Sequence, residues 1–458
     1  KILAACGVPV RVWPRAPLCM IDYFRKEKLF IILIIISLIL SFIKISSDVS
    51  NYDKYFTYDD GTKYHAIIRS PPEQRLWQDA AKIKKELKNN NFKVLLQPYE
   101  FTHHFLPEKI LGIFGMIFNM EFYEDEKNEI YTSDNKKNFF IFQTLIYIFS
   151  IIFFYKKLKK ININELTRLV CVGFLLFEPT INQFNTTIFG ETIFFSLIIL
   201  IFSFLIDLSK KDLFYLFYGF LIGICYLQRS VAMFLISVPL VFIFFRFKKK
   251  SITKIINLLV GFSIILLTVG YLNYNRSNIF YILPTITLHN LTTYLSPKIL
   301  MKKGLTRSEA ISSIIEEKEK IIKDKNLDIN KEVDKIELAK IRKQKAVTLI
   351  LENKLITFIE ITKSTVHSML LNPIEVKNVR IKGMYYYKSD LHKSWIKYRI
   401  TYTILVFLII LCGFFYSVKK RILAPSLFCL IGLSIFSISS WVGYTRYFVP
   451  FYLCLSLY

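Results

Sequence analysis

Long apolar runs alternate with short polar connections along most of the chain. Several runs approach the length that an α-helix needs to cross about 30 Å of hydrocarbon. The pattern predicts an all-α, polytopic membrane helical bundle of about ten spans with two large extracytoplasmic regions. The predicted spans are 29–46, 139–155, 166–182, 187–206, 213–228, 231–246, 252–273, 400–417, 422–441 and a run from about 445.

Basic residues gather in alternate connections between these spans. If the N-terminus is cytoplasmic, every cluster falls on the side where membrane proteins retain Lys and Arg. The opposite side receives segment 178–191, which contains no Lys or Arg. The clusters are Arg25–Lys28, Lys156–Lys160, Lys210–Lys211, Arg246–Lys250 and Lys419–Arg421.

The polar segments divide the chain into regions. Residues 1–19 differ in composition from the rest and precede Met20, so we interpret them as a non-native leader. The last apolar run stops at Tyr458, too early to span, which predicts C-terminal truncation. The other regions are a first transmembrane helix (20–46), a first extracytoplasmic loop (47–138), a transmembrane core (139–273), an extracytoplasmic helical region (274–398) and C-terminal transmembrane helices (399–458).

Three local patterns predict helices in the polar regions. The apolar patch Ile110–Phe118 is too short to span and suits a helix in the membrane interface. Thr306 and Glu309 form a capping-box pattern, which predicts a helix start. Residues 345–371 have apolar positions at helical spacing and suit a helix against the membrane or the bundle.

Composition narrows the class of protein. The net charge is +26, but much of it lies in short loops between apolar runs, so we exclude a nucleic-acid partner and expect membrane lipids instead. The apolar-run cysteines Cys171, Cys225, Cys412, Cys429 and Cys454 read as buried hydrophobic residues. The Ile, Lys and Asn bias suggests a prokaryote, and hence its cell (inner) membrane.

Candidate chemistry begins shortly after the first span. Asp59 and Asp60 are adjacent carboxylates near the bilayer surface, able to act as a general base or to bind a divalent cation. Asp60-Gly61 is also an ordinary turn signal, and the residues alone favour that interpretation. His103 and His104 are candidate substrate or metal ligands, although neighbours in a chain do not share one face of a strand or helix.

The arrangement of these residues resembles the GT-C superfamily of membrane glycosyltransferases, above all its protein-mannosyltransferase and lipid A aminoarabinose transferase-like branch. In that branch the first external loop carries Asp-Glu-x-x-Tyr. Asp60 and Tyr64 keep the Asp-to-Tyr spacing, with Gly61 in place of Glu and Asp59 before the aspartate. Later stretches are also similar to family motifs: 97–107, 177–179 with 190–192, 226–230, Asn275-Arg276 and 444–450.

The resemblance implies a glycosyltransferase that uses a polyprenyl-phosphate-linked sugar donor. Asp60, assisted by Asp59, would deprotonate a lipid, glycan or protein acceptor on the extracytoplasmic face, and the sugar would transfer with inversion. Arg229 and Arg446 would hold the donor phosphate through paired hydrogen bonds. Tyr64, Glu191, Arg276, His103 and His104 are the other predicted substrate-binding residues. No metal ligand is assigned, and a divalent cation stays a candidate cofactor.

Structural explanations compete at several of these positions. Arg229 and Arg446 at helix ends are also explained by snorkelling to the interface. Glu191 suits the N-terminal turn of a helix through the helix dipole. Asp79 is predicted on a solvated helix face.

Two other functions stay open at this point. One is a surface-polysaccharide polymerase or ligase, which normally carries its functional loop late in the chain. The other is a non-enzymatic transporter or flippase, which would place polar groups at the bilayer midplane, often with inverted repeats.

Overall fold

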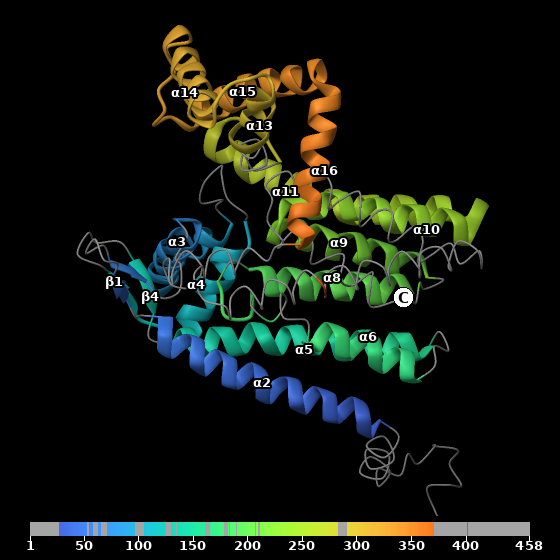
Figure 1. Cartoon of the computed structure of the whole chain (residues 1–458). Coiled ribbons are helices and arrows are strands. Elements are labelled where there is room, and N and C mark those ends of the chain that lie inside the picture. The colour runs from blue at the N-terminus through green and yellow to red at the C-terminus, as the bar shows by residue number, and fades with distance from the viewer. Residues whose placement is uncertain are drawn as a thin grey trace, which may run out of the picture.

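The computed structural model of the chain describes residues 27–52, 55–57, 63–65, 71–96, 105–124, 130–133, 135–160, 165–177, 182, 184–188, 190–206, 208, 211–282, 291–370 and 401. Helices dominate these residues, in agreement with the predicted all-α class (Figure 1). Two short antiparallel hairpins were not predicted. They are β1 (Tyr55–Thr57) with β2 (Lys63–His65), and β3 (Phe122–Glu124) with β4 (Ile130–Ser133).

A bundle of apolar helices forms the body of the molecule (Figure 1). Its central member is α8, with twelve of sixteen residues buried, because a helix that is apolar on all sides needs neighbours all round. The bundle consists of α2 (Lys28–Tyr52), α5 (Lys136–Lys160), α6 (Glu165–Phe177), α8 (Glu191–Ile206), α9 (Asp212–Gln228), η4 (Ser230–Ile236), α10 (Ser237–Phe247), η5 (Lys248–Lys250) and α11 (Ser251–Ser277).

Glycines set the tightest helix contact in the bundle, between α9 and α11. A Cβ atom at Gly219 would overlap the carbonyl oxygen of Leu258, and one at Gly261 would overlap that of Leu216. Small residues let two backbones approach in this way, which is a common basis for helix association in membranes. The two helices run parallel, since α10 makes the return crossing between them.

Three helical stretches are long and apolar enough to cross a membrane: Lys28–Ser47, Lys136–Lys160 and Ser237–Ser277. A turn at Lys248, with φ of 47°, divides the third into α10 and α11. The apolar helices α8 and α9 are shorter, with 16 and 17 residues. The predicted total of about ten spans is therefore not confirmed. The predicted spans 400–417 (except residue 401), 422–441 and the run from 445 lie outside the described residues.

One predicted span is wrong at its start. The apolar run at 166–182 contains α6 (Glu165–Phe177), with residues 178–181 outside the described residues, and the run at 187–206 begins its helix only at Glu191. Between them, Asn182 and residues 184–188 lie across the bundle, where Gln143 Nε2 donates to the carbonyl oxygens of Asn185 (2.6 Å) and Thr187 (2.9 Å). Hydropathy placed the start of the second span too early because residues 184–190 carry no charged side chain.

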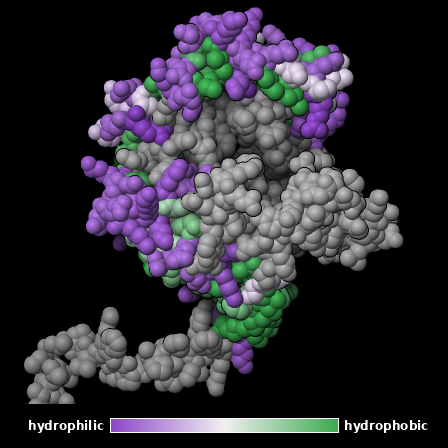
Figure 2. All heavy atoms as spheres, turned by 90° about the vertical axis from the view of Figure 1, so that its left-hand side faces the viewer, coloured by the Kyte–Doolittle hydropathy of each residue, from purple (hydrophilic) through white to green (hydrophobic). Residues whose placement is uncertain are grey.

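A polar cap covers one end of the bundle. We define the cap as α3 (Pro71–Lys88), η3 (Phe92–Leu95), α4 (Pro107–Ile117) and hairpin β3–β4. The patch at Ile110–Phe118 does form a helix, α4, but α4 packs between α3 and the start of α5. Its contact with the bundle is aromatic, with Phe114 against Phe139 and Phe142. Viewed from this end, the described surface is largely hydrophilic, with a hydrophobic patch on the side of α2 (Figure 2).

A group of helices projects from the bundle after α11 (Figure 1): η6 (Leu291–Leu295), α13 (Ser296–Lys302), α14 (Arg307–Asp324), α15 (Glu332–Glu352) and α16 (Lys354–Leu370). The capping box at Thr306 and Glu309 is confirmed at the start of α14. The single helix predicted over 345–371 is wrong. It breaks at Asn353, whose side chain donates to the carbonyl oxygen of Leu349 and so competes with the helical ladder.

Candidate functional site

The connection before α8 delivers a carboxylate into the protein interior. Gly190 has φ of 75°, a left-handed conformation that favours glycine, and Glu191 follows as the first residue of α8. Glu191 is 1% exposed and forms an ion pair with Arg229, the C-cap residue of α9. Both competing interpretations of Arg229 assumed contact with phosphate or solvent. The structure instead gives its guanidinium a buried protein partner.

Glycine at position 190 also allows two other elements to close over this pair. Gln228 Nε2 donates to the Gly190 carbonyl oxygen at 2.9 Å, and the Pro107 ring lies against Gly190. The backbone N–H of Leu106 donates to the carbonyl oxygen of Leu227 at 3.0 Å. The start of α4 is therefore joined to the start of α8 and to the end of α9.

A second buried charged pair follows directly in α4. Glu108 and Lys109 are 2% and 3% exposed, and their charged atoms lie 3.4 Å apart. Lys109 Nζ also donates to the Phe105 carbonyl oxygen at 3.1 Å and lies 3.9 Å from the centre of the Phe105 ring. These contacts compensate the ammonium group without exposing it to water.

Asp79 and Arg276 complete the set from two further elements. The prediction that Asp79 lies on a solvated face is wrong, because α4 covers that side of α3 and leaves Asp79 7% exposed. The charges of Asp79 and Arg276 both act on Lys109. Arg276, near the end of α11, donates from Nη2 to the Tyr281 hydroxyl at 2.9 Å. We name Asp79, Glu108, Lys109, Glu191, Arg229 and Arg276, all buried except the half-buried Arg276, the buried charge cluster.

Burial shifts the proton affinity of the α4 pair. Desolvation raises the pKa of Glu108 to about 7, and the charge of Lys109 only partly offsets this. Desolvation also lowers the pKa of Lys109, against the opposing charge of Glu108. Both groups are thus held in an environment that penalises their ionised forms, which is common where proteins bind or transfer charge.

The structure brings together part of the predicted site. Glu191 and Arg229 meet, and Arg276 contributes to the same cluster through Lys109. The backbone of Tyr64 lies in β2, opposite Phe56 of β1. Asp59 and Asp60 fall between these two strands, outside the described residues, as do His103, His104 and Arg446.

Sequence reasoning missed Glu108, Lys109 and Gln228. A signal was present for the α4 pair, because Leu106-Pro107 marks a helix start and the following run is apolar. Nothing local in the sequence shows that a charged dipeptide at that start is buried. Gln228 carries no such signal, since its role depends on the approach of Gly190 from another helix.

The cluster gathers balanced charges at the capped end of the bundle. It contains three cations and three carboxylates from five helices, most of them shielded from water, where electrostatic interactions are stronger than in solvent. Within the described residues, no three His, Cys, Asp or Glu side chains lie together as a metal site. No known family model matches the chain, and comparison with curated proteins and with solved structures gives no significant match.

Proposed function

We propose that the chain is an integral-membrane glycosyltransferase that moves a sugar from a polyprenyl-phosphate donor to an acceptor on the extracytoplasmic face. The observation that carries the proposal is the buried charge cluster at the capped end of an apolar bundle. A donor of this class has a long apolar tail and an anionic head, so it needs cations at the end of a lipid-facing body.

The surface of the bundle supports residence in a membrane. Large apolar side chains are exposed along α2, α5, α9 and α11, among them Ile43, Phe149, Phe217 and Leu267. Exposed apolar area of this extent marks contact with a membrane or with another protein. Three of these side chains, Ile43, Phe149 and Leu267, lie in the candidate spans of α2, α5 and α11, which favours the membrane.

The two ends of the bundle differ in the way the proposal requires. Lys156, Lys157, Lys159, Lys160, Lys248, Lys249 and Lys250 lie at the ends of α5 and α10, away from the cap, and we call this the lysine end. Lys157 lies over Phe204 near the end of α8, which places the ends of α5 and α8 together. Basic residues favour the cytoplasmic side, so the capped end would face outward.

The proposed reaction assigns each charge a task. The Asp60 carboxylate accepts the proton of the acceptor hydroxyl, whose oxygen attacks the anomeric carbon. The bond from that carbon to the phosphate oxygen breaks, and the polyprenyl phosphate leaves with the electron pair. The half-buried Arg276 is the cation proposed to face this phosphate, and the buried Lys109 adds its positive charge nearby. Arg229, already paired with Glu191, is a positioning residue that fixes α8 against α9.

Transfer from labelled polyprenyl-phosphate sugars by membranes containing the protein tests this proposal. We expect Asp60→Asn to lower the transfer rate at least 100-fold, in the range lost when a general base is removed. Asp59→Asn is the matched neighbour and should lower it less. Unchanged transfer in both variants would remove the general-base assignment.

A transporter or flippase is the second candidate, and the same buried ion pairs favour it. Ionisable residues within membrane helices often mark the path of a transported substrate. Proteoliposomes distinguish the two functions. A flippase moves a fluorescent polyprenyl phosphate between leaflets without an acceptor, whereas a transferase releases it only after the sugar has moved. A labelled lipid-pyrophosphate glycan in the same assay tests the polymerase or ligase alternative.

A further inference from the structure

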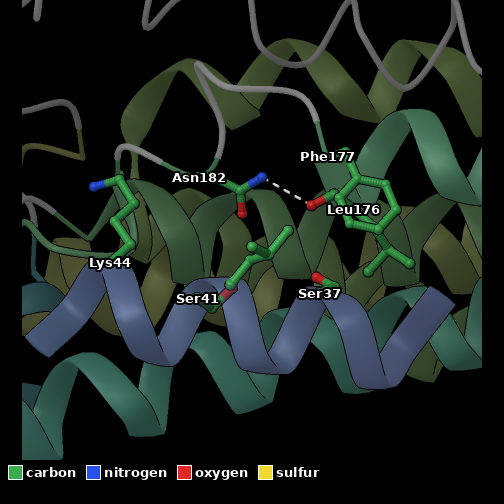
Figure 3. Close-up of a pocket in the computed structure, with 7 residues that line it drawn as sticks. Ser37, Ser41, Lys44, Leu176, Phe177 and Asn182 are labelled. Carbon is green, nitrogen blue, oxygen red and sulfur yellow. Dashed lines mark hydrogen bonds between the residues drawn. The ribbon is translucent and has the colours of Figure 1, made fainter. Parts of the chain in front are cut away.

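A cavity of about 250 Å³ lies between α2 and α6, beneath the segment that precedes α8. Its lining combines three polar or charged residues of α2 with apolar side chains (Figure 3). The lining residues are Ser37, Leu40, Ser41, Lys44, Leu176, Phe177 and Asn182. Leu40 is 51% exposed, so the cavity borders the apolar outer surface of α2.

The polar residues form a stripe on one face of α2. Ser37, Ser41 and Lys44 are spaced by four and three residues, which places them on the same side of a helix. Ser37 and Ser41 are 3% and 9% exposed, and they face Asn182 and Leu176 in Figure 3. Neither serine hydroxyl makes a hydrogen bond with another described residue. A polar stripe of this kind would be costly if this face of the span contacted lipid hydrocarbon.

The upper end of the cavity is held in place by several hydrogen bonds. Asn182 Nδ2 donates to the Leu176 carbonyl oxygen at 2.8 Å, and Lys44 Nζ donates to Thr186 Oγ1 at 3.2 Å. Gln143 fixes the backbone of the same segment from α5. The cavity is thus a preformed part of the bundle, since its walls come from two helices and its roof from a tethered segment.

We propose that this cavity binds a glycerophospholipid with an anionic head group. Lys44, nearest the capped end, receives the phosphate, and Ser41 and Ser37 donate to the ester oxygens one to two helical turns deeper. One acyl chain lies against Leu176 and Phe177. The charge and hydroxyls along α2, followed by the apolar side chains of α6 at the Ser37 end (Figure 3), match the order of phosphate, esters and chain in such a lipid.

This order favours a phospholipid over a polyprenyl phosphate. An isoprenoid chain has no hydrogen-bond acceptor below its phosphate, so Ser37 and Ser41 would face hydrocarbon with their hydroxyls unsatisfied. Burying such a hydroxyl without a partner is unfavourable. The cavity assignment does not rest on the proposed sugar transfer.

Photo-crosslinking of the full chain in lipid nanodiscs tests the proposal. The probe is phosphatidylglycerol with a diazirine on one acyl chain, and labelled peptides are located by mass spectrometry. We expect labelling of α2 and α6 at the cavity. Phosphatidylcholine with the same chain should label it several-fold less, and Lys44→Gln should abolish that preference.

Substitutions on two faces of α2 provide the control. Ser41→Trp fills the cavity and should lower its labelling about tenfold, whereas Ile43→Trp, at a position 59% exposed, should leave labelling unchanged. Ser37→Ala combined with Ser41→Ala keeps the shape, so it tests the hydroxyls in a variant that folds; we expect a several-fold loss.

Three results would overturn the proposal. They are labelling insensitive to Ser41→Trp and to the double alanine variant, equal labelling by the two phospholipids in the unmodified protein, or stronger labelling by an isoprenyl phosphate probe than by phosphatidylglycerol.

Discussion

The lysine end and the capped end of the bundle both contain ion pairs, but they treat charge differently. At the lysine end, one partner of each pair reaches water: Lys159 is 53% exposed beside buried Glu27, and Asp212 is 50% exposed beside buried Lys254. At the capped end, both partners are buried: the side chains of Glu191 and Arg229 are 1% and 9% exposed, and those of Glu108 and Lys109 are 3% and 4% exposed.

Two buried glutamates, Glu27 and Glu108, illustrate this difference between the ends. Burial opposes ionisation of Glu27, but hydrogen bonds from Lys159 and Tyr155, each 2.5 Å long, outweigh it and lower its pKa. Glu108 has a single close cation and its pKa rises to about 7. At the lysine end, the buried Glu27 carboxylate is stabilised by two hydrogen-bond donors. The capped end keeps buried charges whose desolvation is costly for folding.

Removal of Arg229 should give the largest loss of stability. Arg229→Met leaves the Glu191 carboxylate buried beside an apolar side chain, and breaking a buried pair in this way costs about 3–5 kcal/mol. Denaturant titration in detergent micelles measures the free energy of unfolding. Arg229→Met combined with Glu191→Gln should recover at least half of the loss. Equal instability of the single and double variants would show that the two charges are not coupled.

The two glutamates should give opposite pH dependences. The pKa of Glu108 is higher in the folded than in the unfolded state, so its stabilising effect is complete below pH 4.5 and is lost as pH rises towards 7. The shift corresponds to roughly 3 kcal/mol at 1.36 kcal/mol per pKa unit. Glu108→Gln should remove this decline when unfolding free energy is measured between pH 4.5 and 8.

Glu27→Gln is the matched variant at the lysine end. The pKa of Glu27 is lowered, so its contribution is present above the unfolded-state pKa of about 4.5 and is lost as pH falls below it. The substitution should therefore flatten the acid side of the profile and leave the change between pH 4.5 and 7 intact. Profiles of the same sign in both variants would contradict the contrast between the ends.

Gly190 tests how closely the capped end is packed. In Gly190→Ala, the new Cβ meets Gln228 Nε2 and the Pro107 ring, and we expect a loss of about 1–3 kcal/mol. Gly304→Ala is the control, because Gly304 also has positive φ (106°) but open space around the added atom. The difference in unfolding free energy between the variants isolates the contact from the backbone strain. Equal unfolding free energies in the two variants would mean that α4 does not pack tightly against the start of α8.

The smallest effect is expected from Lys159→Gln at the lysine end. The Lys159 side chain is mostly in water, and Glu27 retains its hydrogen bond from Tyr155. Pairs of this exposure contribute about 1 kcal/mol or less, and the loss should shrink further at high salt. Thermal unfolding at two salt concentrations measures it. A loss as large as that of Arg229→Met would show that ion pairs at the two ends contribute equally to stability.

The helical body could be predicted from sequence because hydropathy and caps are local. The apolar runs located α2, α5, α9 and α11, and the Thr306–Glu309 pattern located the start of α14. Local patterns also misled just before α8, where the uncharged residues 187–190 resembled the start of a span. The break at Asn353 was not predicted, because the apolar spacing of the sequence continues through it.

The site was harder to predict because it is assembled from distant segments. Glu191 and Arg229 were both singled out, but their pairing joins residues 38 positions apart through the packing of α8 on α9. Asp79 was misread because its helix is amphipathic, and only the position of α4 shows that this side is covered. The proposed base Asp60 lies outside the described residues and stays a prediction.

Matched removal of one charge from each end, followed by the transfer assay, tests whether the chemistry takes place at the capped end, as we propose. Arg276→Gln should therefore lower transfer from a labelled polyprenyl-phosphate sugar about 100-fold, the loss typical when one charge-stabilising donor is removed. Lys249→Gln at the lysine end should keep the original rate. Equal rates in the two variants would show that the capped end does not hold the donor phosphate.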